Sequence, residues 1–273
     1  MKQFILSRKP DKDGIVKLEG SDFRYLVRIR RLAAGDSFLA LLPDGEETQV
    51  EVLAINGSIL TGKCTFPKNL TQRTAGSKGT EKKSVEELPK IILFQAMPKG
   101  DKMDLIVRQA AEGGITEIVP FISEHSVVKT LSPGKQKFAR WEKIIKEARQ
   151  QSGSRTATII HQPLSMSDLI NYWSTLGQSG ALGLLFHHEG LEQESLHSYL
   201  NSNPKAVALA VGPEGGFSGR EISLFLKSGF KPFKIGDTVL RTETAALYCA
   251  AAIRILLLEK NSWELKQTKN RSA

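Results

Sequence analysis

Ala206-Val207-Ala208-Leu209-Ala210-Val211-Gly212-Pro213-Glu214-Gly215-Gly216-Phe217-Ser218 is the stretch that decides the fold of the carboxyl-terminal part of this chain. Its first six residues form an apolar run with the length of a buried strand. Ser218, followed three residues later by Glu221, predicts a capping box at the start of a helix. The glycines therefore lie in a turn from a strand to a helix. Glycine and proline together make that turn rigid and leave its peptide groups open to a ligand.

Strand and helix patterns alternate on both sides of this turn. Strands are predicted at 91–96, 115–122, 158–161, 181–186, 206–211 and 231–235. Helices are predicted to begin near residues 101, 138, 165, 191, 218 and 242, the last one ending near Glu259. This order predicts an α/β fold with a mainly parallel sheet covered by helices on both faces.

The amino-terminal part of the chain has a different pattern. Short strands are predicted at 4–6, 15–18, 38–42, 49–55 and 58–66, with one helix from Ser21 to about Leu32. The residues that follow are mostly polar or turn-forming, which is typical of a flexible linker. We therefore expect a small β domain at 1–70, a linker at 71–89, an α/β domain at 90–262 and a polar tail at 263–273.

Composition limits the function classes. The 273 residues contain no apolar run of membrane-spanning length and no secretory signal, so a cytoplasmic protein without a membrane partner is expected. Cys64 and Cys249 lie far apart, and neither has a Cys or His at metal-ligand spacing, so we expect no disulfide and no metal site. The net charge of +9 suits a polyanionic partner.

Three predicted strands in succession end in loops that suit a ligand. These loops cover residues 184–190, 212–218 and 235–241. In open α/β sheets, ligands bind at the carboxyl ends of the strands. The loops contain neither GxGxxG nor GxxxxGK[ST], which argues against a dinucleotide oxidoreductase and a P-loop phosphotransferase.

Four segments together resemble one known family. They are Gly-Pro-Glu-Gly-Gly-Phe-Ser at 212–218, Leu-Arg-Thr-Glu-Thr-Ala at 240–245, Ser-Glu-His-Ser at 123–126, and the helix that contains Trp141. The chain resembles the RsmE family of S-adenosylmethionine-dependent methyltransferases of the SPOUT class, which are specific for uridine N3 in 16S rRNA. The resemblance covers most of the chain. It implies a SPOUT-type trefoil-knotted parallel-sheet methyltransferase domain preceded by a small PUA-like β-barrel domain. It also implies a homodimer that acts on 16S rRNA or the small ribosomal subunit.

The resemblance further implies that S-adenosyl-L-methionine (AdoMet) is held mainly by backbone groups of the three loops. Peptide groups can contact adenine only where no side chain blocks the approach, which explains the glycines. The residues expected to contact the cofactor are Leu185, Phe186, His187, Glu189, Val211, Gly212, Pro213, Glu214, Gly215, Gly216, Ile235, Gly236, Val239, Leu240, Arg241, Thr242, Thr244 and Ala245. The adjacent His188 could also contact the cofactor.

Methylation at uridine N3 requires that the N3 proton be removed or that the uridine anion be stabilised. Arg241 is the first catalytic candidate, because its fixed cation favours that anion. Glu243 is the second, and Glu214 could also accept the proton. Glutamates near helix starts often serve only to accept backbone N–H bonds, so the identity of the base stays open. Thr238 stands where the family usually has an arginine, which argues against help from a second arginine at the target base.

RNA contact has a separate signal in the predicted helix 21–32. Arg24, Arg28 and Arg31 fall at positions i, i+4 and i+7 and would line one face, so we expect them to bind phosphates. The alternative is a solvated helix face. Tyr25 lies where the family usually has histidine. Further residues expected to extend the RNA surface are Arg8, Lys99 and Lys102.

The sequence thus predicts AdoMet-dependent methylation of uridine N3 in 16S rRNA. Two alternatives remain open at this point. One is a SPOUT methyltransferase that modifies another RNA nucleotide. The other is an RNA-binding assembly factor without catalytic activity.

Overall fold

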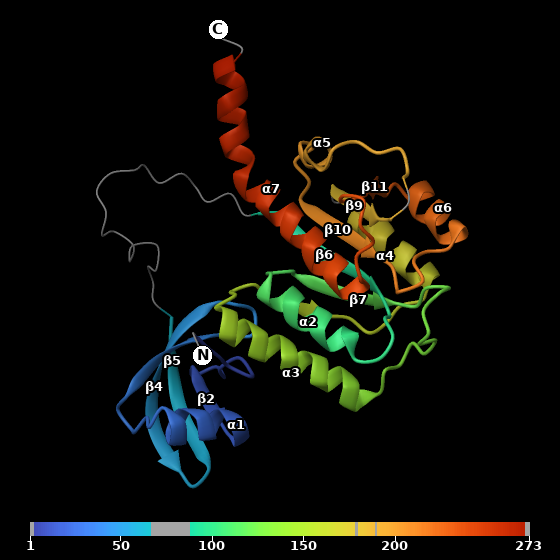
Figure 1. Ribbon diagram of the computed structural model, residues 1–273. Helices are drawn as coiled ribbons and strands as arrows, with labels where there is room; N and C mark the ends of the chain where they lie inside the picture. The colour runs from blue at the N-terminus through green and yellow to red at the C-terminus, as the bar shows by residue number, and fades with distance from the viewer. Residues whose placement is uncertain (1–2, 67–87, 178–179, 189, 271–273) are drawn as a thin grey trace. The chain divides into compact units, whose positions relative to one another are not determined.

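The computed structural model describes residues 3–66, 88–177, 180–188 and 190–270 (Figure 1). The chain forms two compact units. One comprises residues 1–85 with 150–157, and the other comprises residues 86–149 with 158–273. Most of the predicted linker at 71–89 lies outside the described residues.

The first unit is built on a five-stranded mixed sheet with the order β1-β3-β4-β5-β2. Its strands are β1 (Phe4–Ile5), β2 (Ile15–Leu18), β3 (Ser37–Leu41), β4 (Glu47–Asn56) and β5 (Ile59–Thr65). β1 pairs with β3 in parallel, and the other pairs are antiparallel. Buried and exposed residues alternate along β4, so one sheet face covers the core of this unit. All five predicted strands are confirmed within two residues at each end.

The helix of the first unit differs from the prediction. It consists of α1 (Gly20–Phe23) followed by a π-helix, η1 (Arg24–Ile29). The amide of Arg30 bonds to the carbonyl of Tyr25, five residues back. Arg31 lies beyond the helix with a φ of 58°. The predicted α-helical stripe of Arg24, Arg28 and Arg31 is therefore wrong as a helix face, because the wider π-turn ends before Arg31. All three side chains are exposed.

The second unit contains a six-stranded sheet with the order β11-β9-β10-β6-β7-β8. The strands are β6 (Lys90–Ala96), β7 (Glu117–Phe121), β8 (Ile159–Ile160), β9 (Ala181–Phe186), β10 (Ala206–Val211) and β11 (Lys231–Phe233). Every strand pair is parallel, which confirms the predicted sheet type. The carboxyl ends of β9, β10 and β11 consequently lie side by side.

Helices cover both faces of this sheet (Figure 1). They are α2 (Lys102–Glu112), α3 (Lys135–Ser152), α4 (Met166–Gly177), α5 (Leu196–Leu200), α6 (Gly219–Lys227) and α7 (Thr242–Asn270). Residues of α2, α3, α5 and α7 share one hydrophobic core with the sheet, whereas α4 and α6 build the core on the other face. The chain leaves β11 at the edge of the sheet and returns to its middle, where α7 packs on β10 and β6.

Helix α7 is longer than predicted. It continues to Asn270, so the tail expected at 263–273 is helical as far as the structure describes it. No glycine or proline interrupts the sequence between Thr242 and Asn270, and the residues after Glu259 include good helix formers. Among the described residues, no helix has both the length and the apolar composition that crossing a membrane requires.

Candidate functional site

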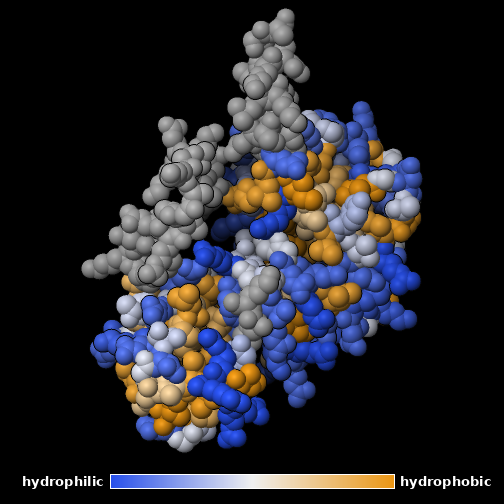
Figure 2. Space-filling model, turned by 60° about the vertical axis from the view of Figure 1, so that its left-hand side comes forward, coloured by the Kyte–Doolittle hydropathy of each residue, from blue (hydrophilic) through white to orange (hydrophobic). Residues whose placement is uncertain are grey.

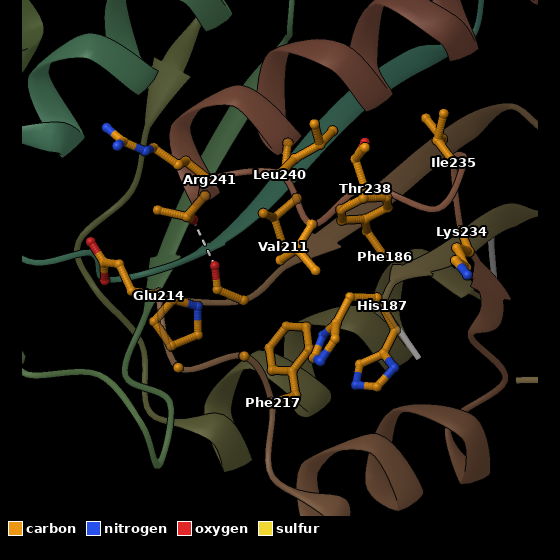
Figure 3. A pocket seen from close by; sticks show the side chains of 18 of the residues that line it. Phe186, His187, Val211, Glu214, Phe217, Lys234, Ile235, Thr238, Leu240 and Arg241 are labelled. Atoms are coloured by element: carbon orange, nitrogen blue, oxygen red, sulfur yellow. Dashed lines mark hydrogen bonds between the residues drawn. The ribbon is translucent and has the colours of Figure 1, made fainter. Parts of the chain in front are cut away.

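The loops that follow β9, β10 and β11 enclose one cavity of about 480 Å³ (Figure 3). In Figure 3, Arg241 and Glu214 lie at one end of the cavity, and Lys234 and Ile235 lie at the other. The start of α7 closes one side. The lining residues are Lys102, Phe186, His187, His188, Val211, Gly212, Pro213, Glu214, Gly215, Gly216, Phe217, Lys234, Ile235, Thr238, Val239, Leu240, Arg241, Thr242 and Ala245.

Most residues expected from the sequence to contact a cofactor lie in this lining. Leu185, Gly236 and Thr244 do not line the cavity, and Glu189 lies outside the described residues. Leu185 is fully buried and packs in the core beneath α4 and α6, because side chains alternate between the two faces of β9. Three further lining residues were not among the expected cofactor contacts: Phe217 and Thr238 lie within predicted ligand loops, and Lys234 directly precedes one.

The glycine loop, defined here as residues 212–217, is a compact turn. The amide of Gly216 donates to the carbonyl oxygen of Pro213 at 2.9 Å, and Gly216 has a φ of +67° that favours glycine. A β-carbon added at Gly212 would lie 3.3 Å from the carbonyl carbon of Gly216. These positions therefore need glycine for the loop to close on itself.

The helix that follows the glycine loop begins as predicted. Ser218 accepts a hydrogen bond from the amide of Glu221, and the Glu221 carboxylate accepts one from the amide of Ser218, which is a capping box. The buried Glu221 carboxylate also accepts hydrogen bonds from the Ser123 hydroxyl at 3.1 Å and the Glu124 amide at 3.0 Å. One carboxylate thus joins α6 to the Ser-Glu-His-Ser segment.

Thr242 joins the start of α7 to the end of β10. Its hydroxyl donates to the carbonyl oxygen of Gly212 at 2.6 Å, a bond that the dashed line in Figure 3 marks. The hydroxyl oxygen of Thr242 in turn accepts a hydrogen bond from Nε2 of Gln95 at 3.0 Å. Thr242 and Gln95 are both buried, so these bonds are shielded from water. They hold two walls of the cavity together.

One lysine forms ion pairs with two acidic side chains, Glu214 in the cavity lining and Glu243 beside it. Nζ of Lys102 lies 2.7 Å from Oε1 of Glu214 and 3.4 Å from Oε2 of Glu243. Burial alone would raise the pKa of Glu214, but the hydrogen bond from Lys102 and backbone N–H donors outweigh it and hold that pKa below its usual range. The bond to Glu214 also raises the pKa of Lys102. Both groups are therefore charged at neutral pH.

The remaining cations at the cavity differ in their partners. Nζ of Lys234 lies 3.2 Å from Oδ1 of Asp237. Arg241 is exposed, and its guanidinium has no ion-pair partner among the described residues. Glu243 does not line the cavity, and its Oε2 atom is buried beside Lys102. In the described part of the chain, no cluster of His, Cys, Asp and Glu is suited to a metal ion.

Comparisons with known proteins identify the family. A family model described as an RNA methyltransferase domain matches residues 86–254, and one described as an RNA methyltransferase PUA domain matches residues 18–63. The ribosomal RNA small subunit methyltransferase E of Aquifex aeolicus is 38% identical over 170 residues, which cover 60% of this chain and 70% of that relative. The chain belongs to the ribosomal RNA small subunit methyltransferase E (RsmE) family. A Borreliella burgdorferi RsmE is 29% identical over 263 residues, covering 96% of this chain and all of that protein.

A solved RsmE structure has the same fold. The crystal structure of RsmE from Neisseria gonorrhoeae bound to S-adenosyl methionine matches with a TM-score of 0.72 and 22% identity, covering 94% of this chain and 98% of that chain. This likeness confirms the SPOUT-type α/β fold with a preceding PUA-like β domain. The trefoil knot that the family resemblance implies at the carboxyl-terminal end stays a prediction.

The residues predicted to bind RNA have varied surroundings. Arg8 donates through Nη2 to the carbonyl oxygen of Lys17 at 2.8 Å, which leaves part of its guanidinium exposed. The Lys99 amide donates to the Glu214 carboxylate at 3.2 Å, and its side chain is exposed. Lys102 lies in the cavity lining and is paired, so its local role is within the site.

Proposed function

We propose that this RsmE-family protein transfers the methyl group of AdoMet to N3 of a uridine in 16S rRNA. The observation that carries the proposal is the cavity, which three loops build at the carboxyl ends of adjacent parallel strands. Relatives named ribosomal RNA small subunit methyltransferase E support the substrate class. The N. gonorrhoeae relative, which binds S-adenosyl methionine on the same fold, supports the cofactor.

The lining of the cavity fits AdoMet chemically. Phe186, Val211, Ile235 and Leu240 supply apolar surface for the adenine, while the glycine loop presents peptide groups without side chains that block access. A β-carbon at Gly216 would lie at ordinary van der Waals distance, 3.5 Å, from Cε1 of His188, so the positive φ and not crowding favours glycine there. When bound, AdoMet supplies an electrophilic methyl group.

The acceptor side of the site depends on Arg241. The N3 proton of uridine must leave before or during methylation, and a fixed cation lowers the free energy of the resulting anion. Arg241 suits this role because its charge is exposed at the cavity and is not neutralised by a carboxylate among the described residues. Glu243, the second catalytic candidate, contacts Lys102 instead of lining the cavity. We therefore assign Glu243 to holding Lys102.

The amino-terminal domain, residues 1–70, is proposed to hold the rRNA. Arg24, Arg28 and Arg31 are exposed around η1 and its end, where they can pair with phosphates. Arg8 adds further positive charge in this domain, and the exposed Lys99 adds positive charge in the methyltransferase domain. This role gives the RNA affinity a strong dependence on salt.

An enzyme that modifies 16S rRNA would work in the cytoplasm, where ribosomes are assembled.

An apolar surface on α7 supports the proposed homodimer. Leu247, Tyr248, Ile255 and Leu258 are between 40% and 59% exposed. Figure 2 shows apolar side chains gathered along the described part of α7. A groove of about 160 Å³ between α2 and α7 adds to this surface. A second copy of the chain would bury this apolar surface. Light scattering of Tyr248→Glu beside the wild type tests the proposed homodimer. We expect the variant to be a monomer, and a mass equal to that of the wild-type dimer would contradict the role of this surface.

One experiment tests the reaction. The protein is incubated with AdoMet and unmodified small-subunit rRNA or particles, and the nucleosides are analysed by mass spectrometry. We expect N3-methyluridine. Another methylated nucleoside would contradict the specificity for N3 and favour a different RNA target. If calorimetry detected no AdoMet binding at high micromolar concentration, the chain would instead act as a non-catalytic RNA-binding factor.

A further inference from the structure

His125 contacts the glycine loop through two hydrogen bonds. Its Nδ1 atom lies 3.0 Å from the carbonyl oxygen of Gly215 and 3.2 Å from that of Gly216. Carbonyl oxygens only accept hydrogen bonds, so Nδ1 must carry the ring proton and donate it. The geometry therefore selects the Nδ1–H tautomer of an otherwise exposed imidazole.

The backbone at Gly215 is closely fitted to this histidine. A β-carbon added at Gly215 would lie 3.0 Å from Cβ of His125, which is closer than ordinary packing allows. Glycine at this position thus lets the segment 123–126 approach the loop. The two carbonyl groups then lie within hydrogen-bond distance of the imidazole.

The segment that carries His125 is itself held firmly. The buried Glu221 carboxylate accepts hydrogen bonds from Ser123 and Glu124, as described above. Nζ of Lys129 donates to the carbonyl oxygens of Glu124 at 2.6 Å and Ser123 at 3.2 Å. Because its neighbours are fixed, His125 can restrain the glycine loop instead of following its motion.

We propose that His125 is a positioning residue of the AdoMet site, which acts by holding the carbonyl groups of Gly215 and Gly216. This inference rests on the proposed function. Both carbonyls belong to the loop that lines the cavity, and removing their donor lets the loop adopt other conformations. AdoMet must then order the loop as it binds, which weakens affinity. The loss expected for one net hydrogen bond is roughly 3- to 10-fold in Kd.

A pair of variants separates this role from a general structural one. His125→Leu removes the donor, whereas His125→Asn keeps an N–H group close to the position of Nδ1. By calorimetry, we expect the AdoMet Kd to rise roughly 3- to 10-fold in His125→Leu and to return to within about twofold of wild type in His125→Asn. Because His125 is exposed, both variants should keep the wild-type Tm.

The matched control is His161→Leu, which removes another partly exposed histidine. His161 bonds Glu117 at 2.9 Å, near the opposite ends of the strands. This variant should leave the AdoMet Kd within about twofold of wild type even if its Tm falls. Equal AdoMet affinity in wild type and His125→Leu would overturn the positioning role, as would failure of His125→Asn to restore binding.

A second measurement does not depend on AdoMet. Nitrogen-15 NMR of histidine-labelled wild type reports the tautomer of each ring, and His125→Asn identifies the His125 signals. We expect the Nδ1–H tautomer for His125 in the protein without AdoMet. Finding the Nε2–H tautomer would overturn the positioning role of His125, even if the protein binds AdoMet. If His125 has the expected tautomer but the wild-type protein does not bind AdoMet, the proposed function is wrong. The positioning role is then wrong as well, because it rests on that function.

Discussion

Thr242→Val is the sharpest test of how the cavity is held together. The substitution keeps the side-chain shape but deletes the hydroxyl that donates to the Gly212 carbonyl at 2.6 Å and accepts from Gln95 at 3.0 Å. Thr242 is 4% exposed and Gln95 is fully buried, so water cannot replace the lost partner without rearrangement. The change therefore leaves one N–H of the Gln95 amide and the Gly212 carbonyl without their partner, although Nε2 keeps its bond to the Ala96 carbonyl, and it weakens the join between α7 and β10.

The structure sets the expected size of the effect. Leaving a buried polar group unsatisfied costs about 1–3 kcal/mol, and we take about 2 kcal/mol here. For a chain of this size, each kcal/mol lowers Tm by roughly 2–4 °C, so thermal unfolding should move down by roughly 4–8 °C. The AdoMet Kd should rise roughly 3- to 10-fold, because Gly212 belongs to the cavity lining.

Thr175→Val is the matched control for Thr242→Val. The exposed Thr175 hydroxyl donates only to the Tyr172 carbonyl within α4, so its loss should change Tm by no more than about 2 °C. Differential scanning calorimetry and titration calorimetry with AdoMet measure both variants. If Thr242→Val matched the wild type in Tm and in Kd, the hydrogen bonds of Thr242 would not hold the cavity walls, and the reasoning would be refuted.

Three other predictions concern the reaction, the RNA and the stability. Arg241→Ala should slow methylation roughly 10²- to 10³-fold in single-turnover assays while the AdoMet Kd stays within about twofold, and an unchanged rate would refute its role at the uridine. Replacing Arg24, Arg28 and Arg31 together by alanine should weaken rRNA binding. It should also reduce the magnitude of the slope of log K, the rRNA association constant, against log salt concentration by up to about 2–3. An unchanged slope would mean that these arginines are solvated and do not contact phosphates. The hydrogen bond with His161 is the largest cause that lowers the pKa of Glu117 below its ordinary value of 4.5. This carboxylate therefore stabilises the fold above that pH and loses the effect as the pH falls through its lower folded-state pKa. The Tm deficit of Glu117→Gln should accordingly shrink between about pH 5 and pH 3, and a constant deficit would contradict this assignment.

The cofactor half of the site could be predicted because its signals are local. The apolar run 206–211 matches β10 at both ends, and Ser218 and Glu221 form the predicted capping box. A turn between a strand and a helix needs glycine where the backbone has positive φ or close contacts, and both occur at Gly216 and Gly212. Each of these constraints acts within a few residues, so the sequence displays it directly.

Helix details were less predictable, for two physical reasons. The apolar pattern around Leu26 requires a helical turn, but it does not determine whether backbone bonds span four or five residues, and η1 uses the longer span. The end of α7 was placed too early because the apolar pattern stops near Glu259. The helix continues since nothing in the next residues breaks it.

The acceptor half depends on pairings between segments that are distant in the sequence. Lys102 looked like an RNA ligand because lysine near a loop is usually exposed, whereas the fold places it against Glu214 and Glu243. A cation already matched by two carboxylates gives little net attraction to an incoming uridine anion. Arg241 has no such partner among the described residues, so its charge is the one available when the uridine loses its proton. Residue type alone made Lys102 a candidate for contact with RNA. Its ion pairs with Glu214 and Glu243 favour Arg241 instead as the group that acts on the target base.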